Sequence, residues 1–316
     1  MTGQGLDWVL GVDGGGTKTV AVVANSLGDV LSYQMMAGLD PTAGPEWEAR
    51  LADLARHLGP VEAAVLGLPY HDEIPAISAR QIELGRVAFG ENCHVVNDVA
   101  VAFEGAFAGQ DGVLILAGTG SMAWARGPLG TRRVGGWGDA FGDEGSAYWI
   151  GRTALGIVSQ HLDGRRASAD FTRDLLHRLG IATDALIGWT YGHANPRAGV
   201  AAVAAHVSAL AQTGDPEAGV VMAQAAAHLA MLGRTAAAAC GAHHPVDWSF
   251  AGGVFNDPTL LTATLKSMNT LPVTPRLPPV GGAVLLAAKQ AGWRVDPDFI
   301  ARLAASLGAQ HKIESF

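Results

Sequence analysis

The stretch WVLGVDGGGTKTVAVVANSLG, residues 8–28, decides the fold of this chain. Four of the six residues from Gly11 to Gly16 are glycine, and glycine-rich loops commonly cradle phosphate groups. In a Walker A loop the lysine follows the last glycine directly, but here Thr17 precedes Lys18. A dinucleotide-binding loop opens a helix, whereas the residues that follow are β-branched and favour a strand. The glycines therefore predict the tip of a β-hairpin, where backbone N–H groups can approach phosphate oxygens.

The same pattern recurs in GVLILAGTGSMAWARGPLGTRRVG, residues 112–135. An apolar strand again runs into small residues at 118–121, and a strand, a turn and another strand follow. Two such hairpins predict a duplicated pair of domains that face a shared cleft.

The residues between and after the hairpins alternate between helix and strand patterns. Helical spacing predicts helices at 46–58, 74–90 and 99–109, and short apolar runs predict strands at 61–68 and 93–98. Helix patterns then dominate at 146–164, 168–180, 200–214, 217–241 and 279–292, interrupted by a strand and glycine turn within 247–258. The chain is therefore expected to be an α/β protein with mixed sheets flanked by helices.

Composition excludes several classes of function. Of the 316 residues 49% are apolar and 16% are charged, which argues against disorder. The net charge is -8, so no nucleic-acid partner is expected. We find no signal peptide or membrane span, and two distant cysteines fit a reducing cytoplasm. Eleven histidines occur without the spacing of a metal site.

Seven ordered motifs resemble one known family. They are GVDGGGTKT (11–19), NDVAVAF (97–103), AGTGS (117–121), GGWGDAFGDEGSAYWIG (135–151), GDP (214–216), FAGGVFN (250–256) and PVGGAVLLA (279–287). Together they resemble the BadF/BadG/BcrA/BcrD-type ATPases, and among these the N-acetylglucosamine kinases. The resemblance implies two RNase H-like lobes of the actin-like fold. The first lobe would comprise 1–117, with a helix at about 293–316 packing back on it, and the second lobe would comprise 118–292.

The resemblance also implies a binding site for ATP and Mg²⁺. The first hairpin would hold the β- and γ-phosphates through Gly14, Gly15, Gly16, Thr17 and Lys18. The second hairpin would act through Thr119, Gly120 and Ser121. The adenosine would lie against Gly214, Gly252, Gly253 and Asn256. Asp13 would be the protein ligand of Mg²⁺.

The sugar-binding residues follow from the same resemblance. Asp98 would be the general base that accepts the proton of the attacking hydroxyl, although an Asp at this point also suits a helix N-cap. Asp143 would bind sugar hydroxyls, with an N-cap role again as the alternative. The backbone of Gly136, Trp137 and Gly138 would join it. In the first lobe the sugar-binding position of the family matches Asp40 or Thr42, depending on whether a one-residue gap is placed when the stretch is matched to the family pattern.

Two stretches depart from the family pattern. Bulky and polar residues fill the loop at 67–73, and Met122 replaces a small residue. The implied reaction is transfer of a phosphoryl group from ATP to N-acetylglucosamine at its 6-hydroxyl, with glucosamine kinase or broad-specificity hexokinase as alternatives. An activator of 2-hydroxyacyl-CoA dehydratases, which carries an iron–sulfur cluster, and a non-catalytic sugar-binding protein rank lower. Family members are often homodimers, but the sequence does not determine the oligomeric state.

Overall fold

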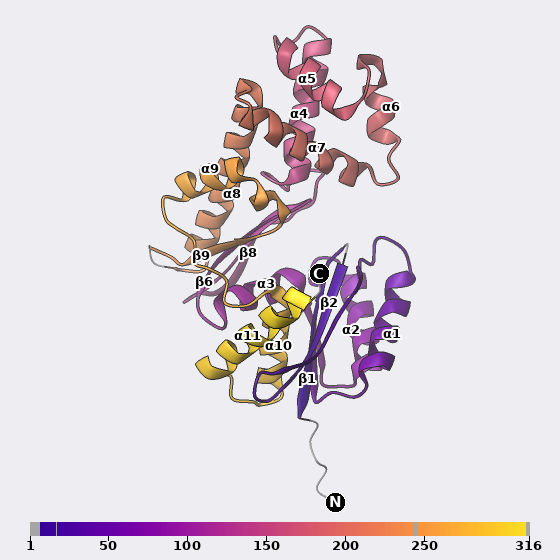
Figure 1. Cartoon of the computed structure of the whole chain (residues 1–316), viewed down its shortest axis with the longest axis vertical. Coiled ribbons are helices and arrows are strands. Elements are labelled where there is room, and N and C mark those ends of the chain that lie inside the picture. The colour runs from indigo at the N-terminus through magenta and orange to yellow at the C-terminus, as the bar shows by residue number, and fades with distance from the viewer. Residues whose placement is uncertain (1–6, 17, 243–244, 314–316) are drawn as a thin grey trace, which may run out of the picture. The chain divides into compact units, whose positions relative to one another are not determined.

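The computed structural model describes residues 7–16, 18–242 and 245–313 (Figure 1). Contacts divide the chain into two compact units. Unit 1 comprises Met1–Gln110 and Thr274–Phe316, and unit 2 comprises Asp111–Val273. The boundaries expected near residues 117 and 292 differ from this division. Residues 112–117 pair within the sheet of unit 2, and the helix that begins at Pro279 packs on the first strand of unit 1.

Unit 1 is built on a five-stranded mixed sheet. Its strands are β1 (Trp8–Gly14), β2 (Lys18–Asn25), β3 (Val30–Ala37), β4 (Ala63–Leu68) and β5 (Cys93–Asn97), in the order β3-β2-β1-β4-β5. Strands β1 and β2 pair antiparallel up to Gly14 and Thr19, so the glycine-rich stretch is a hairpin tip, as predicted. Strands β1, β4 and β5 run parallel, and their carboxyl ends therefore share one edge of the sheet.

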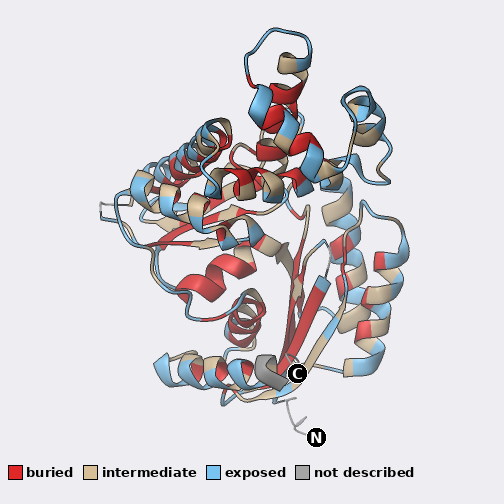
Figure 2. Ribbon diagram, turned by 45° about the horizontal axis from the view of Figure 1, so that its top comes forward, coloured by how far each residue is buried: buried red, intermediate tan, exposed pale blue. Residues whose placement is uncertain are grey.

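Helices cover both faces of this sheet. They are α1 (Glu46–Leu58), α2 (Pro75–Phe89), α3 (Asp98–Phe107), α10 (Pro279–Gln290) and α11 (Pro297–Ile313). Side chains alternate along β1: Val9 joins the core beneath α10 and α11, whereas Leu10 and Val12 join the core beneath α1. Figure 2 shows the buried residues on the inner faces of these helices and along the strands.

Helix α10 packs very closely on its neighbours because glycines line its contact face. A Cβ atom at Gly282 would lie 2.0 Å from the backbone oxygen of Val101 in α3. A Cβ atom at Gly11 in β1 would lie 2.5 Å from the backbone nitrogen of Val284. The PVGGAVLLA motif therefore allows α10 to seat directly on the first strand and on α3.

Unit 2 repeats the hairpin on a four-stranded sheet. Its strands are β6 (Gly112–Ala117), β7 (Ser121–Gly127), β8 (Gly130–Gly135) and β9 (Trp248–Ala251), in the order β8-β7-β6-β9. The helices are α4 (Ala147–Leu162), α5 (Ala169–Leu179), α6 (Leu186–Tyr191), α7 (Pro196–Gln212), α8 (Pro216–Ala239) and α9 (Pro258–Met268). Two 3₁₀ turns span Thr183–Ala185 and Gly253–Asn256. The second predicted hairpin is thus confirmed, with its tip between β6 and β7.

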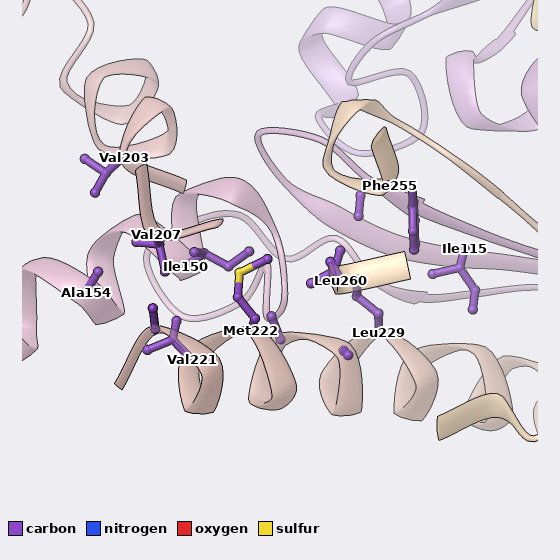
Figure 3. Packing of buried hydrophobic residues seen from close by; sticks show 14 of the residues in the cluster. Ile115, Ile150, Ala154, Val203, Val207, Val221, Met222, Leu229, Phe255 and Leu260 are labelled. Atoms are coloured by element: carbon purple, nitrogen blue, oxygen red, sulfur yellow. The ribbon is translucent and has the colours of Figure 1, made fainter. Parts of the chain in front are cut away.

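The core of unit 2 joins its helices to the sheet. Figure 3 shows side chains of α8, among them Val221 and Leu229, beneath residues of α4 and α7 such as Ile150 and Val207. Ile115 of β6 belongs to the same cluster. This core holds α4, α7 and α8 together beside the second hairpin. Within the part of the chain that the structure describes, no helix has both the length and the apolar character needed to cross a membrane.

Substitution of Gly282 by Ala should destabilise unit 1. The added methyl group meets the backbone of α3, which cannot move as a flexible side chain can, so we expect a loss of about 3 kcal/mol in the free energy of unfolding. Urea denaturation measures the effect. Gly308→Ala in α11 is the matched control, because no atom lies within 4 Å of its added Cβ. A Gly282→Ala protein as stable as this control would contradict the close packing of α10.

Candidate active site

The tip of the first hairpin is formed by backbone atoms. The Gly15 N–H donates to the Lys18 carbonyl at 3.0 Å, and the Leu39 N–H donates to the Gly15 carbonyl at 3.2 Å. A Cβ atom at Gly38 would lie only 2.2 Å from the Gly16 oxygen, so the segment after β3 supports the tip. Predicted residue Thr17 lies outside the described residues. Gly14 is buried against the Leu68 side chain, whereas Gly16 is exposed at the tip.

Asp40 and Thr42 lie beside this tip. The Asp40 carboxylate oxygen Oδ1 accepts hydrogen bonds from the backbone N–H and the hydroxyl of Thr42, both at 2.7 Å. The other carboxylate oxygen of Asp40 is 3.6 Å from the position of a Cβ atom built on Gly16. The two candidates for the sugar-binding position of the first lobe are therefore one hydrogen-bonded pair next to the hairpin.

Two carboxylates meet at the edge where the parallel strands end. Asp13 pairs with Gly67 and Leu68 pairs with Asn97, so Asp13 and Asp98 lie at the same end of the sheet. Asp13 is half-buried. Burial and, to a smaller extent, the negative charge of Asp98 raise the pKa of its carboxyl group, Lys18 lowers it, and the resulting pKa is about 7. Carboxylate oxygens in this arrangement suit a hard cation such as Mg²⁺.

Asp98 is not the N-cap of α3, which was the alternative to a catalytic role. Asn97 takes that position, and its side-chain oxygen accepts a hydrogen bond from the Val99 N–H at 3.0 Å. Asp98 is the first residue of the helix. Because the neighbouring asparagine caps the helix, capping does not account for the carboxylate of Asp98.

The loop after β4 is held by a buried polar network. Gln81 of α2 donates from Nε2 to the Pro69 carbonyl at 2.9 Å and accepts from His71 Nδ1 at 3.0 Å. Asn97 donates from Nδ2 to the His71 carbonyl at 2.9 Å and to Glu73 at 3.2 Å. Gln81 is 0% and His71 is 4% exposed. The bulky 67–73 loop is thus a fixed structure, and it is tied to the residue that precedes Asp98.

Strain in the same loop marks it as a constrained feature. Tyr70 has φ 63° and Asp72 has φ 61°, although neither residue is glycine. Such backbone conformations persist only where surrounding contacts impose them, and they cluster at functional sites. No local pattern predicts the part played by Gln81, since a single glutamine within a helix has no distinctive spacing.

The second hairpin is built on the segment that precedes α4. Ser121 donates its backbone N–H to the Asp143 carboxylate at 3.2 Å and its hydroxyl to the Glu144 carbonyl at 2.8 Å. The Ala147 N–H donates to the Gly118 carbonyl at 2.9 Å. Thr119, Gly120 and Ser121 therefore form a braced tip, which matches their predicted place.

Asp143 is also not an N-cap, contrary to the alternative considered from the sequence. Ser146 caps α4 by accepting a hydrogen bond from the Trp149 N–H at 3.1 Å. Asp143 is 3% exposed, and its carboxylate accepts a second hydrogen bond from Arg197 at 2.7 Å. Sequence reasoning missed Arg197, because 54 residues separate this pair and no motif surrounds the arginine.

The glycine–tryptophan–glycine segment before Asp143 forms an open loop. Gly136 has φ 72° and Gly138 has φ 86°, conformations that favour glycine. Trp137 is 73% exposed, so its ring is not part of the core. Gly136 and Gly138 are half-buried, and the Gly136 carbonyl accepts a hydrogen bond from Arg133, so the role of this backbone in sugar binding stays a prediction.

A pocket of about 670 Å³ lies next to the second hairpin in unit 2. Its walls come from the hairpin, α4, α7, α8 and the 3₁₀ turn after β9, and they include Thr119, Gly253 and Asn256. Most of the α7 wall is alanine, which suits a flat apolar ring. Of the other two predicted adenosine contacts, Gly252 packs against the end of β6 and Gly214 follows the end of α7. Neither lines this pocket.

The cysteines do not support an iron–sulfur cluster. Cys93 and Cys240 are both buried and belong to different units. Burial raises the pKa of the Cys93 thiol to about 12, which disfavours the thiolate that binds iron. Over the described ranges, no three His, Cys, Asp or Glu side chains gather as a metal site.

Two α/β units, each with a mixed sheet and a glycine-rich hairpin at its strand ends, have the architecture of the actin-like fold. Comparison with known proteins identifies the family. The model of the BadF/BadG/BcrA/BcrD ATPase family matches residues 10–287. The chain belongs to this family, in agreement with the resemblance of its motifs.

Relatives within this group are kinases of amino sugars. The N-acetylmuramic acid/N-acetylglucosamine kinase of Clostridium acetobutylicum is 27% identical over 198 residues, which are 59% of this chain and 65% of that protein. The N-acetyl-D-glucosamine kinase of Dictyostelium discoideum is 29% identical over 204 residues, which are 58% of this chain and 64% of that protein. The chain thus matches a little under two thirds of the length of these curated relatives.

A solved structure extends the similarity over nearly the whole chain. It is that of a protein from Chromobacterium violaceum, provisionally assigned as an N-acetylglucosamine kinase. The two chains are 29% identical and superpose with a TM-score of 0.74 over 90% of this chain and 99% of the other.

Replacement of Asp13 by Asn should stabilise the protein increasingly as the pH rises. The folded-state pKa of about 7 lies above the ordinary value of 3.8, so the unfolded chain ionises first and stability falls between these values. Removing the carboxyl group should recover up to about 4 kcal/mol at about pH 8, and less at about pH 5 or where water reaches the carboxyl. Urea denaturation at both pH values measures this difference. Asp53→Asn, at an exposed position of α1, is the control, and equal pH dependence in both variants would refute the interpretation.

Proposed function

We propose that this protein is an ATP-dependent sugar kinase that transfers a phosphoryl group to the 6-hydroxyl of an amino sugar, foremost N-acetylglucosamine. One observation carries the proposal: the Asp13 carboxyl group lies near the charge of Asp98 at the strand ends, beside a glycine-rich hairpin. Phosphoryl transfer depends on a cation that neutralises phosphate charge and on a proton acceptor for the attacking hydroxyl, and two carboxylates suit these tasks, one as the ligand of the cation and one as the base. Similarity to amino-sugar kinases supports the choice of substrate.

Asp98 is the proposed general base. A carboxylate at the first turn of α3 can accept the proton of the attacking hydroxyl when a sugar lies within hydrogen-bond distance. Asn97 holds this turn in place through its cap and through its bonds to the 67–73 loop. The polar network thus supports a defined orientation for the base.

Asp13 is the proposed residue for Mg²⁺. Its raised pKa shows that the site disfavours an unneutralised carboxylate, so a cation that pairs with it relieves that cost. Bound with ATP, Mg²⁺ would neutralise charge on the phosphates. Gly14, Gly15, Gly16, Thr17 and Lys18 would lie against the β- and γ-phosphates, and the lysine ammonium would pair with their charge.

Unit 2 would bind the nucleoside end of ATP. The apolar wall of α7 fits the adenine ring, while Thr119, Gly253 and Asn256 lie at the side of the pocket nearest the hairpin and the 3₁₀ turn. Gly120 and Ser121 would complete the phosphate contact. Gly214 and Gly252 keep their predicted roles beside the nucleotide, although neither lines the pocket.

The predicted sugar contacts are Asp40, Thr42 and Asp98 in unit 1, with Gly136, Trp137, Gly138 and Asp143 in unit 2. Glucosamine kinase and broad-specificity hexokinase are the alternatives, because Asp40 also suits an ammonium group or a hydroxyl donor. A homodimer, the state common in the family, and a cytoplasmic location are further parts of this proposal.

An ADP-release assay with a panel of sugars tests the function. We expect Mg²⁺-dependent ADP release with N-acetylglucosamine, compared against glucosamine, glucose, mannose and N-acetylmuramic acid. Asp98→Asn should lower kcat by about 10³-fold, since it removes the proton acceptor.

Asp53→Asn serves as the matched control for that assay, because it removes a carboxylate at an exposed site of the same unit. It should leave kcat unchanged. If no sugar raises ADP release above the rate without sugar, the kinase proposal is wrong. If a sugar does so and Asp98→Asn is fully active, Asp98 is not the base.

A further inference from the structure

We propose that Arg197 is a positioning residue that clamps Asp143 against the second phosphate hairpin and thereby joins that hairpin to helix α7. The identity of the bound ligand rests on the proposed function. The clamp itself rests on contacts within unit 2. It links three elements that lie far apart in the sequence: the hairpin tip, the loop before α4 and the first turn of α7.

The Asp143 carboxylate lies directly on the hairpin backbone. One of its oxygens accepts the Ser121 N–H at 3.2 Å, and the other accepts Arg197 at 2.7 Å. A Cβ atom on Gly120 would lie 2.9 Å from both carboxylate oxygens, so only glycine fits there. Asp143 has φ 57°, a conformation that its contacts must maintain. The placement of this carboxylate therefore sets the position of the hairpin tip.

Arg197 brings α7 into the same arrangement. It is the second residue of α7, and the residues that follow it, among them Ala198, Ala201 and Ala205, line the pocket of about 670 Å³. Its Nε atom is buried and, among the described residues, has no hydrogen-bond partner, while Asp139 lies 3.7 Å away. The guanidinium thus lies between two carboxylates of the loop, and binds only Asp143 at hydrogen-bond distance.

The charge of Arg197 keeps the Asp143 carboxyl group an acceptor. Burial raises the pKa of Asp143, the Ser121 N–H and Arg197 lower it, and Asp139 raises it. These are the polar and charged groups that face it from β7, α7 and its own loop. Helix α8 presents the Ala225 backbone and Leu229 to the adjoining Gly145. Removal of the guanidinium should therefore raise the pKa, and a protonated carboxyl would hold the hairpin less well.

A ligand in the pocket contacts both α7 and Thr119 of the hairpin. A fixed hairpin can present its N–H groups to phosphates without being ordered first, which favours binding. Loss of the clamp should therefore weaken nucleotide binding through the geometry of residues 118–121. A role limited to stability would lower the unfolding temperature without a specific change at the hairpin.

Hydrogen exchange of the hairpin amides tests the clamp without requiring activity. In Arg197→Met, we expect exchange at residues 118–122 to accelerate by about 10-fold, the size of effect expected for one charge-assisted hydrogen bond. The KM for ATP should rise by a similar factor. The loss of protection at these amides should increase as the pH falls. The midpoint of this pH dependence should lie at a higher pH in Arg197→Met than in the unmodified protein.

Two further variants separate charge from packing. Arg197→Lys keeps the positive charge and should give intermediate exchange with the original pH midpoint. Asp143→Asn should show low protection of these amides, and its protection factors, measured against the intrinsic exchange rate at each pH, should not change from about pH 5 to about pH 8. Arg197→Lys also provides the comparison if Arg197→Met does not fold.

The outcomes distinguish the clamp from the proposed function. If the hairpin amides exchange equally in all variants at every pH, Arg197 does not position Asp143. If they respond as expected but no sugar promotes ADP release, the kinase proposal fails and the clamp stands. If ADP release is sugar-dependent and the variants leave exchange and the KM for ATP unchanged, the clamp alone is wrong.

Discussion

The parallel pairing of β1, β4 and β5 is the constraint on which the candidate site of unit 1 depends. Parallel strands need crossover segments, so α1 and α2 each cover the sheet before the chain returns. The register of these strands brings Asp13, the 67–73 loop and Asp98 to one edge. Groups that are far apart in the sequence thereby share one environment, and the charge of Asp98 acts on Asp13.

Two carboxyl groups close together at this edge lower the stability of the folded chain, and contacts elsewhere must compensate for that loss. The raised pKa of Asp13 reports that cost for one carboxylate, and the positive φ values of Tyr70 and Asp72 report strain in the adjoining loop. Buried hydrogen bonds through Gln81 and Asn97 hold the loop in spite of that strain. This edge therefore lowers the stability of the folded chain, as is common at functional sites.

In unit 2 the glycine-rich hairpin is held by different contacts from those in unit 1. Its hairpin tip is positioned by a buried carboxylate, and that carboxylate is neutralised by an arginine from another helix. Asp143 thus interacts with Ser121 on one side and, on the other, with Arg197 at the start of α7, the helix whose alanines line the pocket of unit 2. Both hairpins are short and rich in glycine, yet one is supported by backbone contacts and the other by an ion pair.

The sequence by itself determined the local elements of this protein. The two hairpins, the α/β class and most helices follow from glycine placement and from the periodicity of apolar residues, which are properties of neighbouring positions. The order of the motifs indicated the family. The role of a single side chain was less well determined by the sequence, because an aspartate at position 98 or 143 suits a helix N-cap as well as a binding or catalytic site.

Tertiary structure decided the contacts between distant residues. It assigned the caps to Asn97 and Ser146, placed β6 in unit 2 and α10 in unit 1, and brought Arg197 to Asp143. It also set the pKa of Asp13, because burial and the field of Asp98 exist only in the folded chain. No local pattern encodes these features, since each depends on which surfaces meet when the sheets and helices pack.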